Sequence, residues 1–185
     1  MLLKKIKYLF LYIKSLIFYS FRFKKFGFLS IVRSPIINWE FVNNVSIGSR
    51  SRILGNNRIE CLKKWNEKLF NPNVIIGNNV NIGHNFFLTC ASKIEICDGV
   101  LISDNVAIID NSHKHNIGSS SNKTKISCEP ILIEKNVTIY RNVTILEGVT
   151  IGENSVIGAN AIIKKNIPAY SIVVGIGKII GNVKK

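Results

Sequence analysis

A period of six residues runs through most of the chain from Ile47 onward. From Ile133 the sequence reads IEKNVT, IYRNVT, ILEGVT, IGENSV, IGANAI and IKKNIP, and each block opens on an isoleucine. Similar blocks begin at Ile76 and Ile96, and a less regular set begins at Ile47. An α-helix repeats every 3.6 residues and an alternating strand every two, so neither element produces a strict period of six.

The period predicts a three-sided solenoid. Each side of such a prism is a short strand with an aliphatic residue pointing inward, and three blocks of six make one coil. Asn and Gly recur between the strands, where a tight corner needs the left-handed backbone conformation that they tolerate. Stacked coils pair their strands in parallel and bury one continuous aliphatic column. We therefore expect an all-β fold of about five coils, the first of them starting at Ile47.

Two polar stretches interrupt the period. The longer one, residues 114–130, reads KHNIGSSSNKTKISCEP, and the shorter one reads KWNEKLFNPN around Trp65. A long excursion from a compact solenoid usually carries function. We expect the loop 114–130 to form part of a site; a tolerated insertion is the alternative.

The basic charge of the chain is concentrated at its start. The chain carries 25 Lys and Arg against 11 Asp and Glu, a net charge of +14, and eight of the basic residues lie in residues 1–33. The first acidic residue is Glu40. Lys14 interrupts the only run that approaches the roughly 18 apolar residues needed to span a membrane. We predict a basic, aromatic-rich amphipathic segment over residues 1–40, followed by a solenoid domain over residues 41–185.

Such a segment suits an anionic membrane surface, with lysines on the head groups and aromatic rings at the acyl boundary. We therefore expect residues 1–33 to contact a membrane surface; packing of this helix on the body of the protein or on a partner is the alternative. No small-residue cleavage site follows the apolar stretch, so export is not predicted. The rest of the chain shows no basic stripe or recognition motif, so we expect no nucleic-acid partner.

The four cysteines do not form a metal or disulfide motif. Cys61, Cys90, Cys97 and Cys128 show no CxxC spacing. A zinc site and a disulfide framework are both poorly supported. We expect buried, reduced thiols and no metal.

The repeated blocks resemble those of the hexapeptide-repeat acyltransferases, and the resemblance covers residues 47–180. The stretch ILEGVTIGENSVIGANAIIKKNIPAYSIVVG is similar to the C-terminal signature of sugar O-acetyltransferases of the maltose and galactoside type, and of relatives in capsule and O-antigen assembly. This resemblance implies a left-handed parallel β-helix and a homotrimer. It also implies that acetyl-CoA lies between neighbouring prisms, where a histidine of one subunit faces the thioester.

The catalytic histidine is expected at His113. Acetyl transfer to a sugar hydroxyl needs a base that takes the hydroxyl proton, and neutral imidazole can do so at pH 7. His113 ends the block IIDNSH just before the long polar stretch, where the family's catalytic histidine lies. His115 is the rival, because the H-x-H pair leaves the register open. Asp110 either orients His113 or is a solvated corner residue, and His84 is expected to be a surface corner residue.

The resemblance also assigns cofactor contacts. Ala159 in the block IGANAI, the pair Lys164 and Lys165, and the later Lys178 match positions that contact acetyl-CoA in the family. Solubility is the alternative role for each lysine.

Two departures from the family pattern bear on the ligands. Many relatives read WIGANV where this chain reads TIYRNV, so that Thr138, Tyr140 and Arg141 replace a Trp, a Gly and a small residue. Arg141 either contacts a CoA phosphate or obstructs the usual cofactor path. In addition, residues 86–91 read FFLTCA, where maltose-type enzymes carry asparagines that hold the acceptor, which argues against a free small sugar.

These features together predict an acetyl-CoA-dependent O-acetyltransferase. Its acceptor is expected to be a sugar hydroxyl of a surface polysaccharide, such as capsule or lipopolysaccharide, or of its lipid-linked precursor. Direct transfer requires no metal. The expected location is cytoplasmic, peripheral on the inner face of the cytoplasmic membrane. An N-acetyltransferase of an amino sugar and a non-catalytic solenoid scaffold are the alternatives. A γ-type carbonic anhydrase is disfavoured, because it needs three histidine zinc ligands at a different spacing.

Overall fold

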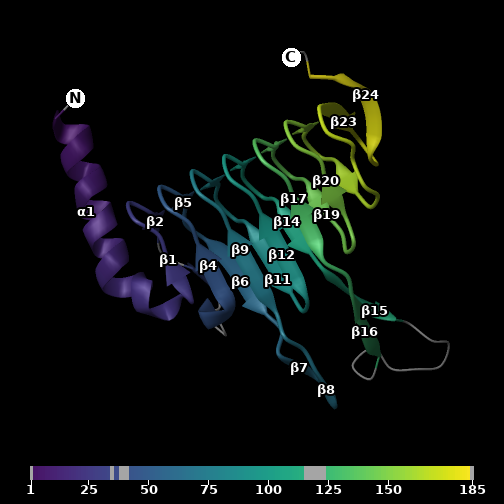
Figure 1. The fold of residues 1–185 in the computed structure, drawn as a ribbon, viewed down its shortest axis with the longest axis horizontal. Coiled ribbons are helices and arrows are strands. Elements are labelled where there is room, and N and C mark those ends of the chain that lie inside the picture. The colour runs from purple at the N-terminus through teal and green to yellow at the C-terminus, as the bar shows by residue number, and fades with distance from the viewer. Residues whose placement is uncertain (1, 34–35, 38–41, 115–123, 184–185) are drawn as a thin grey trace.

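The computed structural model describes residues 2–33, 36–37, 42–114 and 124–183. It is a three-sided prism whose coils stack in one row, with helix α1 (Leu2–Tyr19) at the N-terminal end of the row (Figure 1). Each coil contributes one short strand to each side. All strand pairs along the stack are parallel except the last one, β23–β24.

The first side consists of β1 (Lys25–Phe26), β4 (Val45–Ile47), β9 (Asn73–Ile76), β12 (Lys93–Ile96), β17 (Ile131–Ile133) and β20 (Thr150–Ile151). The second side consists of β2 (Ile31–Val32), β5 (Arg52–Ile53), β10 (Asn81–Ile82), β13 (Leu101–Ile102), β18 (Thr138–Ile139), β21 (Val156–Ile157), β23 (Ser171–Val174) and β24 (Lys178–Asn182). The third side consists of β3 (Ile36–Ile37), β6 (Asn57–Cys61), β11 (Phe87–Cys90), β14 (Ala107–Ile109), β19 (Thr144–Ile145) and β22 (Ile162–Ile163).

The hexad isoleucines occupy the inside of the prism, as the period predicts. On the first side, Ile47 pairs with Ile76, and the same register continues through Ile96, Ile133 and Ile151. All five side chains are at most 1% exposed. Burying an aliphatic side chain of this size contributes roughly 1.5–3 kcal/mol. The column along the prism axis is therefore the main source of stability.

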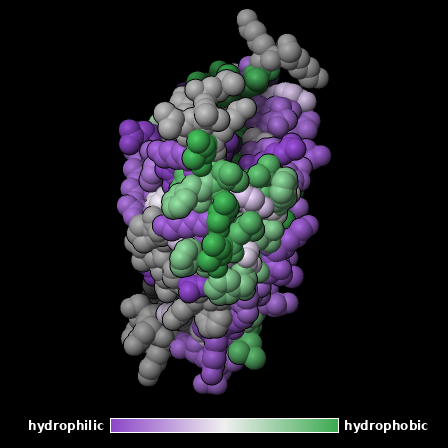
Figure 2. Space-filling view, turned by 90° about the vertical axis from the view of Figure 1, so that its left-hand side faces the viewer, coloured by the Kyte–Doolittle hydropathy of each residue, from purple (hydrophilic) through white to green (hydrophobic). Residues whose placement is uncertain are grey.

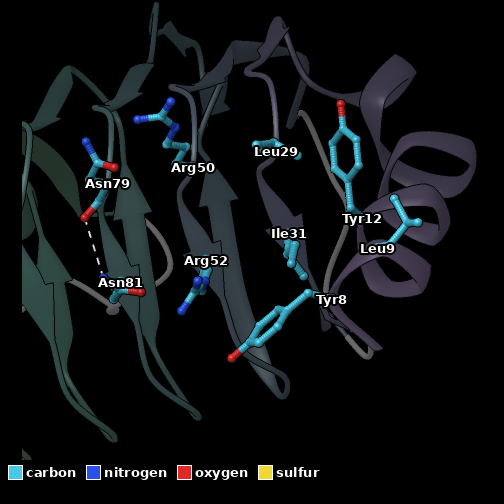
Figure 3. Close-up of a pocket in the computed structure, with 9 residues that line it drawn as sticks. All are labelled: Tyr8, Leu9, Tyr12, Leu29, Ile31, Arg50, Arg52, Asn79 and Asn81. Carbon is cyan, nitrogen blue, oxygen red and sulfur yellow. Dashed lines mark hydrogen bonds between the residues drawn. The ribbon is translucent and has the colours of Figure 1, made fainter. Parts of the chain in front are cut away.

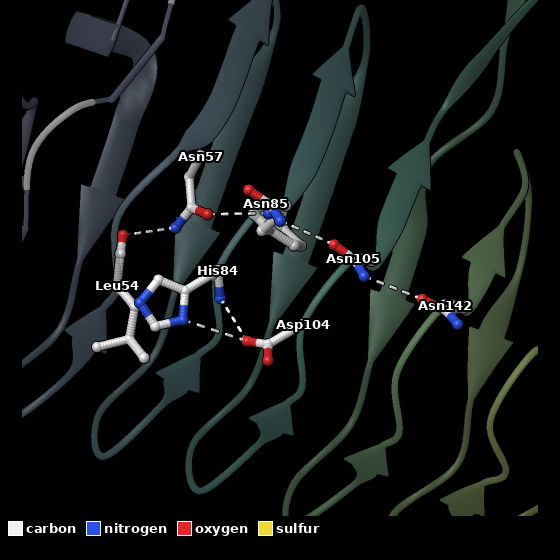
Figure 4. A network of polar contacts seen from close by, with 8 residues as sticks. Leu54, Asn57, His84, Asn85, Asp104, Asn105 and Asn142 are labelled. Carbon is white, nitrogen blue, oxygen red and sulfur yellow. Dashed lines mark hydrogen bonds and ion pairs between the residues drawn. The ribbon is translucent and has the colours of Figure 1, made fainter.

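Left-handed residues turn the chain at the corners. Asn85, Asn105, Asn142 and Asn160 have φ between 54° and 61° and lie one above the other at the corner between the second and third sides. Their side-chain amides form a ladder with N···O distances of 3.0, 3.1 and 3.0 Å, of which Figure 4 shows the part from Asn85 to Asn142. Asparagine thus supplies both the tolerated conformation and a bond between coils.

The β-helix begins earlier than expected. Three strands at residues 25–37 form a first coil, so the described stack has six complete coils instead of about five, and the boundary drawn at residue 41 lies too late. Phe26 and Val32 are six residues apart and face inward in this coil. The Phe26 side chain is partly buried, and Val32 is 3% exposed. The basic and aromatic residues around them hide this hexad in the sequence.

Helix α1 lies against this first coil. The Ser15 hydroxyl accepts a hydrogen bond from the N–H of Val32 at 3.0 Å, and Tyr19 is 6% exposed. A short 3-10 helix, η1 (Ser20–Arg22), leads from α1 toward β1, and η2 (Val42–Asn44) precedes β4. The side of α1 away from the coil presents apolar side chains to solvent (Figure 2). No helix among the described residues is long and apolar enough to cross a membrane.

The cysteines are free, as expected, but only half of them are buried. Cys61 and Cys90 are buried on neighbouring strands, whereas Cys97 and Cys128 are of intermediate exposure. Burial raises the pKa of the Cys61 thiol to about 12, and the nearby charge of Asp110 contributes to this rise. The two buried thiols therefore act as small apolar groups of the core.

The asparagine ladder can be tested at Asn105. Replacement by Gly keeps the left-handed conformation and removes two side-chain hydrogen bonds, whereas replacement by Ala also imposes backbone strain. We expect Asn105→Ala to lower the free energy of unfolding by about 1 kcal/mol more than Asn105→Gly does. Urea unfolding measures both; equal losses would contradict a conformational role for this corner.

Candidate functional site

Two antiparallel hairpins project from one edge of the prism, where the third side turns into the first (Figure 1). The hairpin of β7 (Lys64–Trp65) and β8 (Lys68–Leu69) follows β6. The hairpin of β15 (Asn111–Lys114) and β16 (Lys125–Cys128) follows β14. Both polar interruptions of the period therefore leave the prism at the same edge. In its described part, the stretch expected to be the loop 114–130 contains strand β16, which pairs with β15.

The two hairpins meet through one indole ring. The Nε1–H of Trp65 donates to the backbone oxygen of Thr124 at 2.9 Å. The Trp65 ring also contacts the ring of His113 edge to face, with centroids 4.8 Å apart and an interplanar angle of 68°. Sequence reasoning did not assign Trp65 to the site. Its position within the shorter interruption was the available signal.

His113 is exposed and its orientation is held by a hydroxyl. Its Nδ1 lies 2.9 Å from Oγ1 of Thr124. If Nδ1–H donates to this oxygen, Nε2 is the acceptor nitrogen, which is the form that a general base needs. Thr124 therefore occupies the orienting position that the sequence suggested for Asp110. His115, the alternative base, lies outside the described residues.

Asp110 has a structural role in this arrangement. It is fully buried, and its carboxylate accepts hydrogen bonds from the N–H groups of Ala91 and Ser92 at 2.7 and 2.8 Å and from the Asn111 amide at 3.0 Å. The expectation that it is either a partner of His113 or a solvated corner residue is therefore wrong. Asp110 instead fastens the base of the β15–β16 hairpin to the preceding coil.

A second polar cluster lies on the other face of the hairpin. The Ser112 hydroxyl donates to Glu147 at 2.6 Å and lies 3.1 Å from the hydroxyl of Ser127. Side chains alternate along a strand, so this cluster and His113 face opposite ways. Glu147 belongs to the next coil, and the sequence pattern did not indicate its contact with the hairpin.

The cofactor candidates divide between two edges of the prism. Arg141 and Ala159 occupy equivalent corner positions of successive coils between the second and third sides, and the N–H of Asn160 donates to the Arg141 oxygen at 3.0 Å. Lys178 follows the β23–β24 turn at this same edge, where the N–H of Ile162 donates to Gly175.

Lys164 and Lys165 follow β22 at the other edge, the one that carries the hairpins. Both lysines are exposed. Within one chain, the third side therefore separates His113, Lys164 and Lys165 from Arg141, Ala159 and Lys178. The structure brings each set together along its own edge.

His84 is an exposed corner residue, as the sequence indicates. Its Nδ1 lies 3.4 Å from Oδ1 of Asp104 (Figure 4). Both residues lie in the same corner column as Arg141. The backbone N–H of His84 donates to Asp104 at 2.7 Å, and this bond is the main reason that the pKa of Asp104 lies below its usual value. His84 therefore belongs to the corner and lies away from the hairpin edge.

An open pocket of about 570 Å³ lies between the hairpins. Trp65, the three lysines Lys68, Lys114 and Lys125, and one acidic residue, Glu67, line it. Thr124, which contacts His113, also lines it. The pocket therefore offers an aromatic wall and positive charge close to the expected base. Such a surface can bind a polar acceptor and any acidic group that it carries.

Comparison with known proteins identifies the repeat. Residues 130–165 match the family model of the bacterial transferase hexapeptide (six repeats). No curated protein sequence matches the chain. A hexapeptide-repeat acetyltransferase from Vibrio cholerae, also solved with acetyl-CoA, has a TM-score of 0.66 and 25% identity; the match covers 94% of this chain and 82% of that one.

Two further solved structures share the fold. AntD, an N-acyltransferase from Bacillus cereus in complex with dTDP and 3-hydroxybutyryl-CoA, has a TM-score of 0.74 and 20% identity, covering 92% of this chain and 88% of that one. A galactoside acetyltransferase in complex with coenzyme A has a TM-score of 0.57 and 24% identity, and the match covers 84% of this chain and 64% of that one. The hexapeptide resemblance and the left-handed parallel β-helix are thus confirmed.

The structural role of Asp110 predicts a loss of stability on its replacement. Asp110→Asn puts an amide where two buried N–H groups need acceptors, and we expect it to lower the free energy of unfolding by about 2 kcal/mol or more. Asp98→Asn is the matched control, because Asp98 accepts the N–H of Asn78 at 2.7 Å at the surface. In urea unfolding, that control should lose less than about 1 kcal/mol of its free energy of unfolding. Equal losses in the two variants would contradict the structural role of Asp110.

Proposed function

We propose that this protein is an acetyl-CoA-dependent acetyltransferase with His113 as general base. One observation carries the proposal. The histidine at the position that the family resemblance assigns to the base lies beside an open pocket, with one ring nitrogen at 2.9 Å from Thr124 and its ring against Trp65. The acyltransferase activities of the Vibrio and Bacillus proteins and of the galactoside acetyltransferase support it.

The arrangement suits direct transfer. Nε2 of neutral His113 takes the proton of the acceptor hydroxyl while its oxygen bonds to the thioester carbonyl carbon. The tetrahedral intermediate then collapses, the carbon–sulfur bond breaks, and the imidazolium returns the proton to the CoA sulfur. The products are the acetyl ester and CoA. The Thr124 hydroxyl keeps the ring orientation through both proton transfers.

The proposed acceptor is a sugar hydroxyl of a surface polysaccharide or of its lipid-linked precursor. The hairpin pocket is wide and basic, which suits a larger or acidic glycan better than a free small sugar. An amino sugar is the second candidate, because AntD is an N-acyltransferase and the same base could serve an amine. Matched acceptors that differ only in a hydroxyl or an amino group would distinguish the two reactions.

The proposed assembly is a homotrimer whose active sites lie between copies. One chain separates His113 from Arg141 and Ala159 by the width of its third side. A neighbouring prism could place its own corner residues opposite the hairpin edge. The acetyl-CoA would then lie between two chains, with Lys164 and Lys165 near the hairpins. Arg141 would contact a CoA phosphate, as would Lys178 on the same edge.

The proposed location is the inner face of the cytoplasmic membrane. Helix α1 presents apolar side chains away from the prism, and Lys7 and Lys14 are exposed beside them. This composition fits a helix that lies in the plane of an anionic bilayer surface. A lipid-linked glycan would then be present at the same surface.

The base can be tested by paired substitutions. We expect His113→Ala to lower kcat about 10²–10⁴-fold with little change in acetyl-CoA affinity, because only proton transfer is lost. Thr124→Val keeps the shape of the side chain and removes its hydroxyl, so a smaller fall in kcat is expected. Thiol release from acetyl-CoA with glycolipid extracts as acceptor measures both. Full activity of His113→Ala would contradict the proposed role.

The shared site predicts complementation between two inactive variants. Arg141→Glu should raise the KM for acetyl-CoA, whereas His113→Ala should lower kcat. Mixed trimers of the two variants would contain sites with an intact His113 from one chain and an intact Arg141 from another. We expect activity to return on co-expression and not on mixing preformed homotrimers. Sites contained within single chains would give no recovery.

A further inference from the structure

A groove separates helix α1 from the second side of the prism. It is a cavity of about 550 Å³, lined by Tyr8 and Tyr12 of the helix and by Arg50 and Arg52 of the second coil (Figure 3). A smaller cavity of about 320 Å³ continues it along the second side and adds Arg33. Asp104 is the acidic residue in its lining. The groove is therefore basic, with aromatic rings on one wall.

Backbone strain marks the same groove. Arg50 and Leu29 both have positive φ, 58° and 57°, at the corner between the first and second sides. Asparagine or glycine fills this corner in the next coils, as at Asn79, Gly99 and Asn136. A left-handed Arg or Leu costs free energy that Asn largely avoids. The side chains of both residues with a strained backbone line the groove. This placement indicates that the lining serves a purpose other than stability.

The guanidinium of Arg52 is held over an aromatic ring. Its carbon lies 4.8 Å from the centroid of the Tyr8 ring. This contact links the prism to α1 and fixes the position of the charge. A guanidinium held in this way is suited to an anionic group with several oxygens, such as a phosphate. Arg50 adds a second positive charge farther along the same groove (Figure 3).

The opposite face of α1 is apolar. Its exposed side chains recur at helical spacing and form one stripe (Figure 2). The stripe consists of Ile6, Leu9, Phe10, Ile13, Leu16 and Ile17, and Leu9 at its edge also lines the groove. Ser15 and Tyr19 lie on the other side of the helix, against the first coil. Lys7 and Lys14 flank the stripe. A basic, aromatic edge beside an apolar stripe is typical of a helix that lies in a bilayer interface.

We propose that the groove between α1 and the second side binds the phosphate head group of an anionic phospholipid, whose acyl chains lie along the apolar stripe. The inference rests on the proposed membrane association. A helix is about 10 Å wide and an interfacial helix inserts about 5–10 Å. With the stripe inserted, the groove behind the helix lies at head-group depth, where Arg50 and Arg52 meet lipid phosphates.

Charge favours a lipid over a second copy of the chain. Eight basic residues and no acidic one lie in residues 1–33. Two such segments packed together would bring like charges into contact, and their repulsion would oppose association. An anionic membrane surface would instead attract the same charges. The occupant of the groove is therefore assigned to the bilayer.

The test uses the full chain and vesicles of two compositions, phosphatidylcholine alone and phosphatidylcholine with phosphatidylglycerol, in co-sedimentation at about 0.15 M salt. The groove variant is Arg50→Asn with Arg52→Gln, in which the first substitution introduces the residue type that the next coil carries at Asn79. The control variant is Arg58→Gln with Lys93→Gln, which removes two basic side chains that pair with Glu60 and Glu95 on other sides.

We expect the wild-type protein to prefer the phosphatidylglycerol vesicles, the groove variant to bind them about thirtyfold more weakly, and the control to stay within about twofold. Equal losses in the groove and control variants would overturn the inference in favour of diffuse attraction. A third variant, Phe10→Ser with Ile17→Ser, separates the two proposals. If it abolishes binding while the groove variant binds as wild type does, the groove assignment alone fails. If the wild-type protein binds neither kind of vesicle, both the membrane association and the groove assignment fail.

Discussion

The inward aliphatic column supports every other feature of this molecule. A single coil cannot bury its isoleucines, so each coil depends on the coils above and below it. Ile47, Ile76 and Ile96 illustrate this, because each is covered by its parallel partner in the neighbouring coil. Strict parallel register also fixes the surface. A residue at one corner lies directly above the residue at the same place in the previous coil, as Ala159 lies above Arg141.

The rigid stack allows the chain to place function on its excursions. The two hairpins leave the prism at one edge from different coils, and their contact through Trp65 and Thr124 joins residues 59 positions apart. Asp110 fastens the base of the second hairpin through buried hydrogen bonds. His113 therefore belongs to a local arrangement whose position is set by the core and whose chemistry is set by the hairpins.

The sequence was sufficient for those features that the period encodes. It predicted the parallel prism, the left-handed asparagine corners and the place of His113 at the end of a block. It did not predict the contact of Trp65 with His113, because that contact depends on how two interruptions meet in space. It also missed the first coil, where Phe26 and Val32 stand among basic and aromatic residues. The role of Asp110 was misjudged, because hexad spacing does not reveal which backbone N–H groups a corner carboxylate meets.

Under the proposed membrane association, the position of α1 would constrain which part of an acceptor the site can reach. Helix α1 lies at the N-terminal end of the stack, next to the first coil, whereas the β15–β16 hairpin leaves the fourth (Figure 1). At about 4.8 Å per coil, the fourth coil lies on the order of 15 Å from the first. With α1 in the plane of a bilayer, His113 would act well above the head groups. A sugar joined directly to the lipid would lie below its reach. For the proposed lipid-linked acceptor, this geometry would favour a sugar farther along a growing glycan, and the distance from the lipid would then contribute to specificity.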